Sequence, residues 1–275
     1  MELTADRQRP ADGPVPVLAA TAAAAGRIVG DLVLFHAAHS TCSQKVRLCL
    51  AEKGLAYQSR VLEIRRHEHL SPEYLAVNPN GVVPTLLHDG VPVIDSSVIC
   101  EYLDEVFPVP ALSPETALGR AAMRAWLRYL EEVPTTAIRI PSINAIFLPV
   151  LRELGAAWDD VKRRAPLRKH LYERIGDQGF DKREVEHSME QLTSSLERAG
   201  RALQSGPWLL GELFSLVDIV YLPTLARLED LGLGWMWDSL PEVADWYGRM
   251  KSRPSFERAF FAGSRLRATD ARHVF

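Results

Sequence analysis

The stretch "NPNGVVPTLLHDGVPVID", residues 78–95, decides the fold of this chain. Two runs rich in valine, leucine and isoleucine flank Asp89 and Gly90, and an Asp-Gly pair between such runs is a strong short-range signal of a tight β-hairpin. Val83-Pro84 enters the first run, at a place where a strand tolerates a proline. The stretch therefore predicts two adjacent antiparallel strands joined by a tight turn.

Strand and helix patterns alternate around this hairpin. Upstream, the apolar run "LVLF" at 32–35 is typical of a buried strand, an amphipathic segment follows it up to Gly54, and "YQSRVLEI" at 57–64 is strand-like. A second helix is expected from Pro72, and "DSSVICEYLDEVF" at 95–107 opens with helix-capping residues. The order β-α-β-α-β-β-α predicts one mixed sheet covered by helices, which is an α/β unit.

The second half of the chain shows helical patterns only. Prolines at 108, 110 and 114 mark a boundary, and after them apolar residues recur at helical spacing without any strand pattern. Ser215 and Asp218 have the S-x-x-D form of a capping box at a helix start. The helical stripes are Met123, Trp126, Leu127 and Leu130, and then Val185, Met189, Leu192, Leu196 and Leu203.

Between these stripes, residues 134–184 lack a regular pattern and contain several prolines. We expect an irregular connection there, much longer than the usual helix connection of about 2–8 residues. Its basic cluster has no interleaved aromatic residues and no glycine cradle, so we interpret it as a solvated charged surface and not as a phosphate site. The cluster consists of Lys162, Arg163, Arg164, Arg168, Lys169 and Arg174.

These patterns predict the domain organisation. Residues 1–30 are expected to be a flexible N-terminal extension, 31–108 the domain with the sheet, and 109–118 a linker. Residues 119–263 are expected to form an all-helical domain that contains the long 134–184 insertion, and 264–275 a C-terminal tail.

Composition narrows the class of protein. A formal net charge of -3 and 47% hydrophobic residues indicate a globular protein without overall attraction to nucleic acid or anionic membranes. No apolar segment approaches the roughly 18–20 uninterrupted residues of a membrane span, so no membrane partner is expected. The three cysteines lack zinc-type spacing, which favours a reduced, cytoplasmic protein. His67 and His69 have no third ligand at a sensible spacing, so no metal is expected.

The whole arrangement resembles the cytosolic glutathione S-transferases from about residue 31 to residue 263. It is most similar to serine-type members with a zeta- or theta-like N-terminal motif, to bacterial glutathione-dependent β-etherases and to ganglioside-induced differentiation-associated proteins. The resemblance implies a thioredoxin-like domain followed by an all-helical domain, with glutathione as co-substrate and a homodimer as the assembly. The matching stretches, in the family's order, are "HSTCSQKVR", "NPNGVVPTL", "DSSVICEYL" and "LLGELFSLVDIVYLP".

In this family the residue that activates glutathione lies seven positions before the helix residue matched by Arg47, which implies Ser40. Ser40 also stands where a strand gives way to a helix, and free backbone N–H groups and the positive helix end favour an anion there. Ser40 or Thr41 could instead simply cap the helix. Cys42 is a competitor, because a thiol in the first turn of a helix can have a lowered pKa and act as a nucleophile.

The resemblance also implies the contacts with glutathione. Val83-Pro84 matches the cis-proline turn whose backbone bonds the cysteine of glutathione as an added short strand. Asp95 and Ser96 match the acidic-serine pair that holds the γ-glutamyl end, with Ser96 on the carboxylate and Asp95 on the ammonium. As the alternative, Asp95 and Ser96 are simply helix caps, and both roles can hold together.

A histidine completes the expected glutathione site. His69 falls where some transferases place a histidine against the glycine carboxylate of glutathione, with His67 and His39 as alternatives. The electrophile is expected between the loop "HAAHS" and the helix that carries Met123, Trp126 and Tyr129. Core packing of these three side chains is the other interpretation.

The expected function is that of a glutathione transferase that activates the thiolate for attack on a small apolar electrophile, with aryl-ether cleavage as one version. Two alternatives stay open. One is a non-catalytic, glutathione-transferase-like binding protein that uses residues 134–184 as its partner surface. The other is a thiol-disulfide reductase that acts through Cys42.

Overall fold

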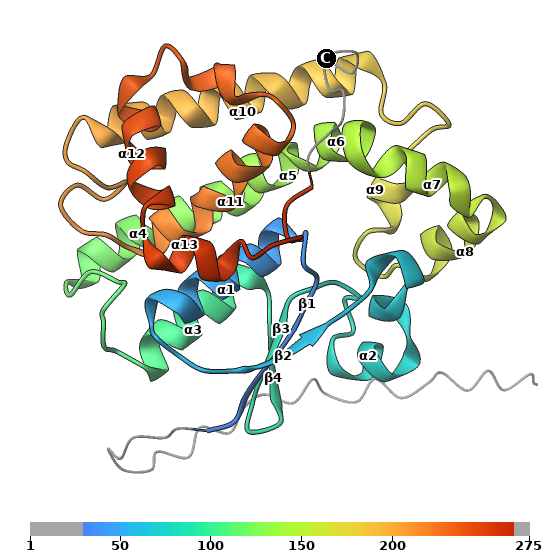
Figure 1. Cartoon of the computed structure of the whole chain (residues 1–275), viewed down its shortest axis with the longest axis horizontal. Helices are drawn as coiled ribbons and strands as arrows, with labels where there is room; N and C mark the ends of the chain where they lie inside the picture. The colour runs from blue at the N-terminus through green and yellow to red at the C-terminus, as the bar shows by residue number, and fades with distance from the viewer. Residues whose placement is uncertain (1–29, 267–275) are drawn as a thin grey trace, which may run out of the picture. The chain divides into compact units, whose positions relative to one another are not determined.

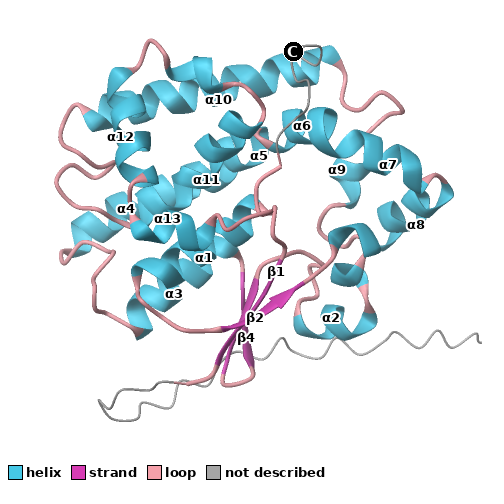
Figure 2. Ribbon diagram, viewed as in Figure 1, coloured by secondary structure: helices cyan, strands magenta, loops and turns pink. Residues whose placement is uncertain are grey.

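The computed structural model describes residues 30–266. The predicted extension before Gly30 and the last nine residues of the predicted tail lie outside the described residues. Four strands form one mixed sheet of order β2-β1-β3-β4, in which β1 runs parallel to β2 and antiparallel to β3 (Figure 2). Asp89 and Gly90, with φ of 50° and 79°, join β3 to β4, so the predicted hairpin is confirmed. The strands are β1 (Leu32–His36), β2 (Gln58–Val61), β3 (Thr85–His88) and β4 (Val91–Ile94).

Helices between and after the strands complete the predicted β-α-β-α-β-β-α order. α1 begins after Ser40, and Gly54, with φ of 63°, follows its end as predicted. Leu50 of α1, Ile99 of α3 and Leu86 of β3 are fully buried in one core, which fixes both helices on the sheet. The elements are α1 (Thr41–Glu52), the short 3-10 helices η1 (Ile64–Arg66) and η2 (Glu68–Leu70), α2 (Pro72–Val77) and α3 (Ser96–Val106).

The strand register brings several loop segments to one edge of the sheet. β1 and β2 are parallel and end together, so residues 37–40 and 62–69 leave the sheet at the same edge. β3 runs the other way and starts at that edge with Thr85, which pairs with Phe35 near the end of β1 and with Ile94 at the end of β4. The segments that carry the predicted site therefore meet at one edge.

The remaining helices form the all-helical part, centred on α11, whose residues are almost all buried. The predicted capping box starts this helix. The carboxylate of Asp218 accepts hydrogen bonds from the backbone N–H groups of Ser215 (3.0 Å) and Leu209 (3.0 Å) and from the indole N–H of Trp246 (2.8 Å). Helices outside the insertion are α4 (Ala117–Glu132), α10 (Lys182–Leu203), α11 (Leu216–Asp230), η4 (Gly234–Trp237), α12 (Pro241–Lys251) and α13 (Pro254–Ala259).

The prediction of an irregular insertion was wrong, because residues 134–184 are mostly helical. Pro134 and Pro149 lie in the first turns of α5 and α7, where a proline removes no helical hydrogen bond, so these prolines mark helix starts. A short π-helical segment, η3, connects α6 to α7. The elements are α5 (Pro134–Ala137), α6 (Arg139–Ser142), η3 (Ile143–Phe147), α7 (Leu148–Leu154), α8 (Ala156–Arg164) and α9 (Lys169–Glu173).

The insertion packs on the sheet part through a small apolar cluster. Leu70 of η2 is buried together with Val161 of α8 and Ala165 directly after it. The carbonyl oxygen of Leu70 also accepts a hydrogen bond of 3.4 Å from the guanidinium of Arg164. In Figure 1, α7, α8 and α9 accordingly lie on the same side of the described chain as α2. The two parts thus meet beyond the edge of the sheet.

By length and composition alone, one helical run among the described residues, Ala117–Leu154, could cross a membrane. Core helices pass the same test, which makes this weak evidence. Met123, Leu127 and Leu130 of this run are buried in the main core.

Candidate functional site

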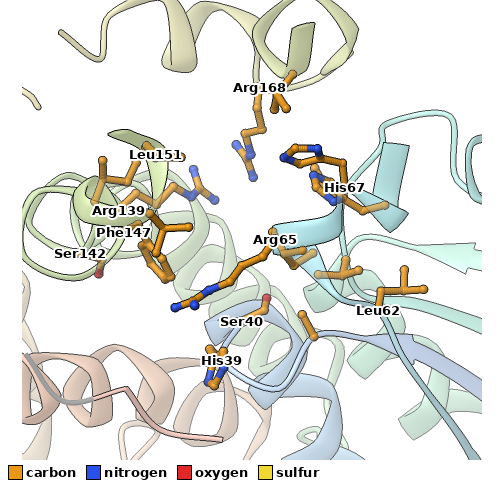
Figure 3. Close-up of a pocket in the computed structure, with 18 of the residues that line it drawn as sticks. His39, Ser40, Leu62, Arg65, His67, Arg139, Ser142, Phe147, Leu151 and Arg168 are labelled. Carbon is orange, nitrogen blue, oxygen red and sulfur yellow. The ribbon is translucent and has the colours of Figure 1, made fainter. Parts of the chain in front are cut away.

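A cavity of about 350 Å³ opens at the edge of the sheet, and the insertion forms its opposite wall. Figure 3 shows side chains from both walls pointing into this space. The sheet side contributes residues from the segments 37–42, 61–69 and 81–83, and the insertion contributes residues from α6 to α9. Of the predicted site residues, the cavity is lined by Ser40, Thr41, Cys42, His69 and Val83.

Two buried arginines fix the loop that carries Ser40. Arg47 of α1 donates hydrogen bonds to the carbonyl oxygens of Ala37 (3.2 Å) and Ala38 (2.9 Å). Arg227 of α11 donates one to the carbonyl oxygen of His39 (2.6 Å). Burial lowers the pKa of both arginines to about 10, so both remain charged at neutral pH. The loop is therefore held by α1 and by the helical part at once.

Ser40 is half-buried at the start of α1, and its hydroxyl is directed into the cavity (Figure 3). Its Oγ accepts a hydrogen bond of 3.2 Å from the backbone N–H of Ser43, so the predicted cap is present. This bond uses a lone pair of the oxygen and leaves the hydroxyl proton, which has no acceptor within residues 30–266. Ser40 can therefore cap the helix and donate to an anion at the same time.

The turn that precedes β3 presents backbone groups to the cavity. The hydroxyl of Tyr74 and the amide of Asn78 donate to the carbonyl oxygen of Val82 at 2.7 and 2.9 Å, which holds the turn in place. The peptide bond between Val83 and Pro84 is cis. Within residues 30–266 neither the N–H nor the C=O of Val83 has a hydrogen-bond partner. An extended peptide can pair with such free backbone groups as an added strand.

Asp95 and Ser96 stand at the same edge of the sheet, directly after β4, but outside the residues that line the cavity. One carboxylate oxygen of Asp95 accepts from the backbone N–H groups of Ser97 (3.0 Å) and Val98 (3.2 Å), so Asp95 caps α3. Asp95 is exposed and Ser96 is buried, with 4% of its surface accessible. The predicted helix-cap role is therefore present for Asp95.

Three histidines lie at the cavity, and burial keeps them neutral. Burial, and after it the charges of the neighbouring His67 and Arg164, lowers the pKa of His69 to about 4. It also lowers the pKa of His39 and of His67. Within residues 30–266 the Nδ1 atoms of His69 and His39 are buried and have no hydrogen-bond partner, which leaves them for a ligand. The described residues contain no cluster of three or more His, Cys, Asp or Glu side chains placed to hold a metal ion.

The cavity also contains arginines that were not predicted as site residues. Arg65 of η1, Arg139 of α6 and Arg168, which precedes α9, point into it (Figure 3). Arg168 belongs to the basic cluster that we interpreted as a solvated surface, and for this residue that interpretation was wrong. For Arg163 it was right, because this side chain is 72% exposed. The only sequence signal was the cluster itself, since nothing local connects residues 65, 139 and 168.

The three side chains that we expected beside the electrophile lie outside the cavity. Met123 is buried in the main core, and Arg198 of α10 lies over the rings of Trp126 (4.6 Å) and Tyr129 (3.9 Å). None of the three lines the cavity. Its apolar wall comes from the insertion instead, through Ile138, Ile143, Phe147, Leu151 and Leu154.

Comparison with known proteins adds independent information. Two family models match the chain: glutathione S-transferase, N-terminal domain, at residues 39–106, and glutathione S-transferase, C-terminal domain, at residues 182–249. Most of the insertion lies between the two matched segments, and so does the wall that it contributes to the cavity.

Relatives match over most of the chain. Maleylacetoacetate isomerase of Pseudomonas aeruginosa is 31% identical over 224 residues, which is 80% of this chain and 91% of the relative. Protein LigF of Sphingobium sp. is 28% identical over 230 residues, 79% and 88% of the two chains. The crystal structure of beta-etherase LigF superimposes with a TM-score of 0.75 at 24% identity and covers 83% of this chain and 98% of that one.

The human ganglioside-induced differentiation-associated protein 1-like 1 is 28% identical over 302 residues, 93% of this chain and 80% of that protein. The predicted resemblance to the bacterial β-etherases and to the ganglioside-induced differentiation-associated proteins is thus confirmed, and so is the predicted fold class. On the two matched domains and the 31% identity to maleylacetoacetate isomerase, this chain belongs to the glutathione S-transferase family.

Proposed function

We propose that this glutathione transferase binds glutathione along the turn at Val83 and holds its sulfur beside the hydroxyl of Ser40. The observation that carries the proposal is the hydroxyl of Ser40, which lines the cavity at the start of α1 and has no acceptor for its proton within residues 30–266. A thiol with a pKa of about 8.5 is only about 3% ionised at pH 7, and lowering this pKa by ~1.5 units, or ~2 kcal/mol, ionises about half of it. One hydrogen bond to a charged group is worth about 1.5–3 kcal/mol, and a helix start adds to it.

The remainder of glutathione would lie along the edge of the sheet. The free N–H and C=O of Val83 pair with its central residue, and the Nδ1 of His69 meets the glycine carboxylate. At the other end, Ser96 takes the γ-glutamyl carboxylate through its hydroxyl and its own backbone N–H, while Asp95 takes the ammonium. These roles give the free backbone groups of Val83 and the Nδ1 of His69 a ligand of matching chemistry.

The thiolate then attacks an electrophile that enters from the side of the insertion. In the aryl-ether version, a carbon–sulfur bond forms at the carbon that carries the ether oxygen, the carbon–oxygen bond breaks, and the aryloxide leaves with the bonding electrons and takes up a proton. The similarity to beta-etherase LigF supports this version. Cleavage of a model aryl ether with one equivalent of glutathione, followed by chromatography, tests it.

The experiment for the central proposal is a titration of the thiolate absorbance of bound glutathione. We expect Ser40→Ala to raise the apparent thiol pKa by at least about one unit and to lower kcat/KM at least about tenfold. Ser71→Ala is the matched control, because Ser71 caps α2 with the same 3.2 Å bond outside this cavity. A wild-type complex whose thiol titrates like free glutathione contradicts the proposal and favours a non-catalytic binding protein.

Cys42 supports a second candidate, thiol-disulfide exchange, because this half-buried thiol lines the same cavity next to Ser40. Glutathione itself would reduce the mixed disulfide that forms on Cys42. Reductase activity that survives Ser40→Ala and disappears in Cys42→Ser would favour this candidate. Activity that disappears in Ser40→Ala and survives in Cys42→Ser favours the transferase.

A further inference from the structure

The wall of the cavity formed by the insertion carries positive charge that the proposed glutathione contacts leave unused. The charged lining residues other than histidine are Arg65, Arg139, Arg168, Arg227 and Glu63. Arg227 has a carboxylate nearby, since its Nε lies 3.9 Å from Asp230. Within residues 30–266 the guanidinium groups of Arg65, Arg139 and Arg168 have neither a hydrogen bond nor an ion pair, so the cavity has a clear excess of cations.

Arg139 and Arg168 are the two that belong to the insertion. Both are half-buried, and their guanidinium groups point into one space in Figure 3. Burial lowers the pKa of Arg168, and repulsion by the nearby Arg139 contributes to this shift, while neither guanidinium forms an ion pair within residues 30–266. A guanidinium group is planar and can bind a carboxylate through two parallel hydrogen bonds, which makes two neighbouring arginines a suitable site for this anion.

The position of this pair separates it from the proposed glutathione site. Glutathione would use the sheet edge, with its sulfur at Ser40, so a molecule that meets the sulfur from the other side lies against the insertion. Apolar side chains of that wall, Phe147 and Leu151 among them, adjoin Arg139 and Arg168. A ligand that satisfies this wall has an apolar body and an anionic group.

We propose that the electrophile of this enzyme is an organic anion, with an aromatic or unsaturated body against η3 and α7 and a carboxylate between Arg139 and Arg168. This inference rests on the proposed function and replaces the predicted small apolar electrophile with a carboxylate-bearing one. The carboxylate orients the body so that its reactive carbon faces the thiolate at Ser40.

A matched pair of electrophiles tests the inference: a chlorodinitrobenzoate and the corresponding chlorodinitrobenzamide. With either, the thiolate forms a carbon–sulfur bond at the carbon that bears chlorine, and chloride leaves with the bonding electrons. Rates are divided by the uncatalysed rate with free glutathione. We expect kcat/KM for the benzoate to exceed that for the benzamide at least about tenfold, since hydrogen bonds between charged groups contribute about that much.

Three variants locate the preference. Arg139→Met and Arg168→Met should each lower kcat/KM for the benzoate about ten- to hundredfold while the benzamide rate and the KM for glutathione stay within about threefold. The retained benzamide rate shows that the variants are folded. Arg163→Met is the control, because this arginine is exposed on α8 and pairs with Asp160. Equal losses for both electrophiles, or a raised KM for glutathione, overturn the inference.

Binding without turnover keeps this test independent of the proposed function. Calorimetry with dinitrobenzoate and dinitrobenzamide, in the absence of glutathione, should show tighter binding of the benzoate, and Arg168→Met should remove the difference. If the thiol of glutathione is not activated but this preference is present, the proposed function fails and the anion site stands. Equal affinities of the wild type for the two compounds overturn the anion site whatever the activity.

Discussion

At the end of β1, the imidazole of His36 lies between two partners. A guanidinium nitrogen of Arg47 stands 3.1 Å from its Nδ1, and the hydroxyl oxygen of Ser59 stands 2.8 Å from its Nε2. Because a guanidinium can only donate, the Nδ1 must be an acceptor and the single ring proton lies on Nε2. Burial, followed by the charge of Arg47, lowers the pKa of His36 to about 4. A second proton therefore disfavours the folded state.

This residue leads to a prediction about pH. A histidine with a pKa of about 4 in the folded protein and about 6.5 in the unfolded chain contributes stability that is complete above pH 6.5 and is lost as the pH falls towards 4. His69, whose pKa is also lowered to about 4, behaves in the same way. We expect the free energy of unfolding, from urea titrations, to fall by about 2 kcal/mol for each of the two between about pH 7.5 and pH 5.

Two histidine variants test this assignment. His36→Asn should reduce the loss on acidification by about 2 kcal/mol, whatever its effect at neutral pH, because one histidine with a lowered pKa is gone. His170→Asn is the control, since that side chain is 96% exposed. A loss on acidification that is the same in His36→Asn and in the wild type contradicts the prediction.

Single residues also show where sequence reasoning about the site succeeds and where it ends. Ser40 and Val83 belong to short motifs whose local pattern, a strand end before a helix or a proline before a strand, indicates their positions without the rest of the chain. The arginines at 65, 139 and 168 come from three separate segments, and only tertiary packing brings their side chains together. A basic cluster in sequence does not tell which of its members turns inward, and Arg168 is the one that does.

Among the elements, the turn before β3 contains a glycine, Gly81, that leaves little room for a side chain. Gly81 has φ of 59°, and a Cβ at this position would lie 2.9 Å from side-chain atoms of both Leu70 and Pro166. We expect Gly81→Ala to lower the free energy of unfolding by about 2–4 kcal/mol, from the left-handed backbone and the overpacking together. The KM for glutathione should rise as well, because the turn that presents Val83 starts at Gly81.

A second glycine separates the cost of the left-handed backbone from the cost of overpacking. Gly54 has nearly the same φ, 63°, but nothing lies within 4 Å of a Cβ placed there. Gly54→Ala should therefore cost only about 1 kcal/mol and leave the KM for glutathione unchanged. Equal urea midpoints for the two variants would show that overpacking against Leu70 and Pro166 adds no energetic cost at Gly81.

The elements of the sheet part were predictable because each has a local signal, whereas the insertion was not. "LVLF", the Asp-Gly turn and the capping residues at 95–97 each specify their structure within a few residues. In the insertion, prolines suggested a break in regular structure, yet Pro134 and Pro149 occupy first helical turns. The helices there are short, and packing on α10 and η2 stabilises them more than any periodic pattern of their own.

For the described chain as a whole, the insertion is the part that adds a second wall to the edge of the sheet and so forms the cavity. Its main apolar cluster includes Ile140, Phe180 and, from α10, Val185, which connects it to the helical part. Its contact with the sheet part is much smaller and centres on Leu70 and Val161. An element held by one larger and one smaller cluster is expected to open at the smaller one first.

Hydrogen exchange can show this difference in local stability. Val161→Ala removes two methyl groups from the smaller cluster, at a cost of about 1–2 kcal/mol, and should speed exchange in α8 and η2 while α10 and α11 keep the wild-type rates. Leu196→Ala, in the fully buried core of α10, should lower the global free energy of unfolding by about 2–5 kcal/mol and so speed the slowest amides of α10 and α11. If Val161→Ala accelerates α11 as much as α8, the insertion and the core unfold as one unit, and the cavity cannot open on its own to admit an electrophile.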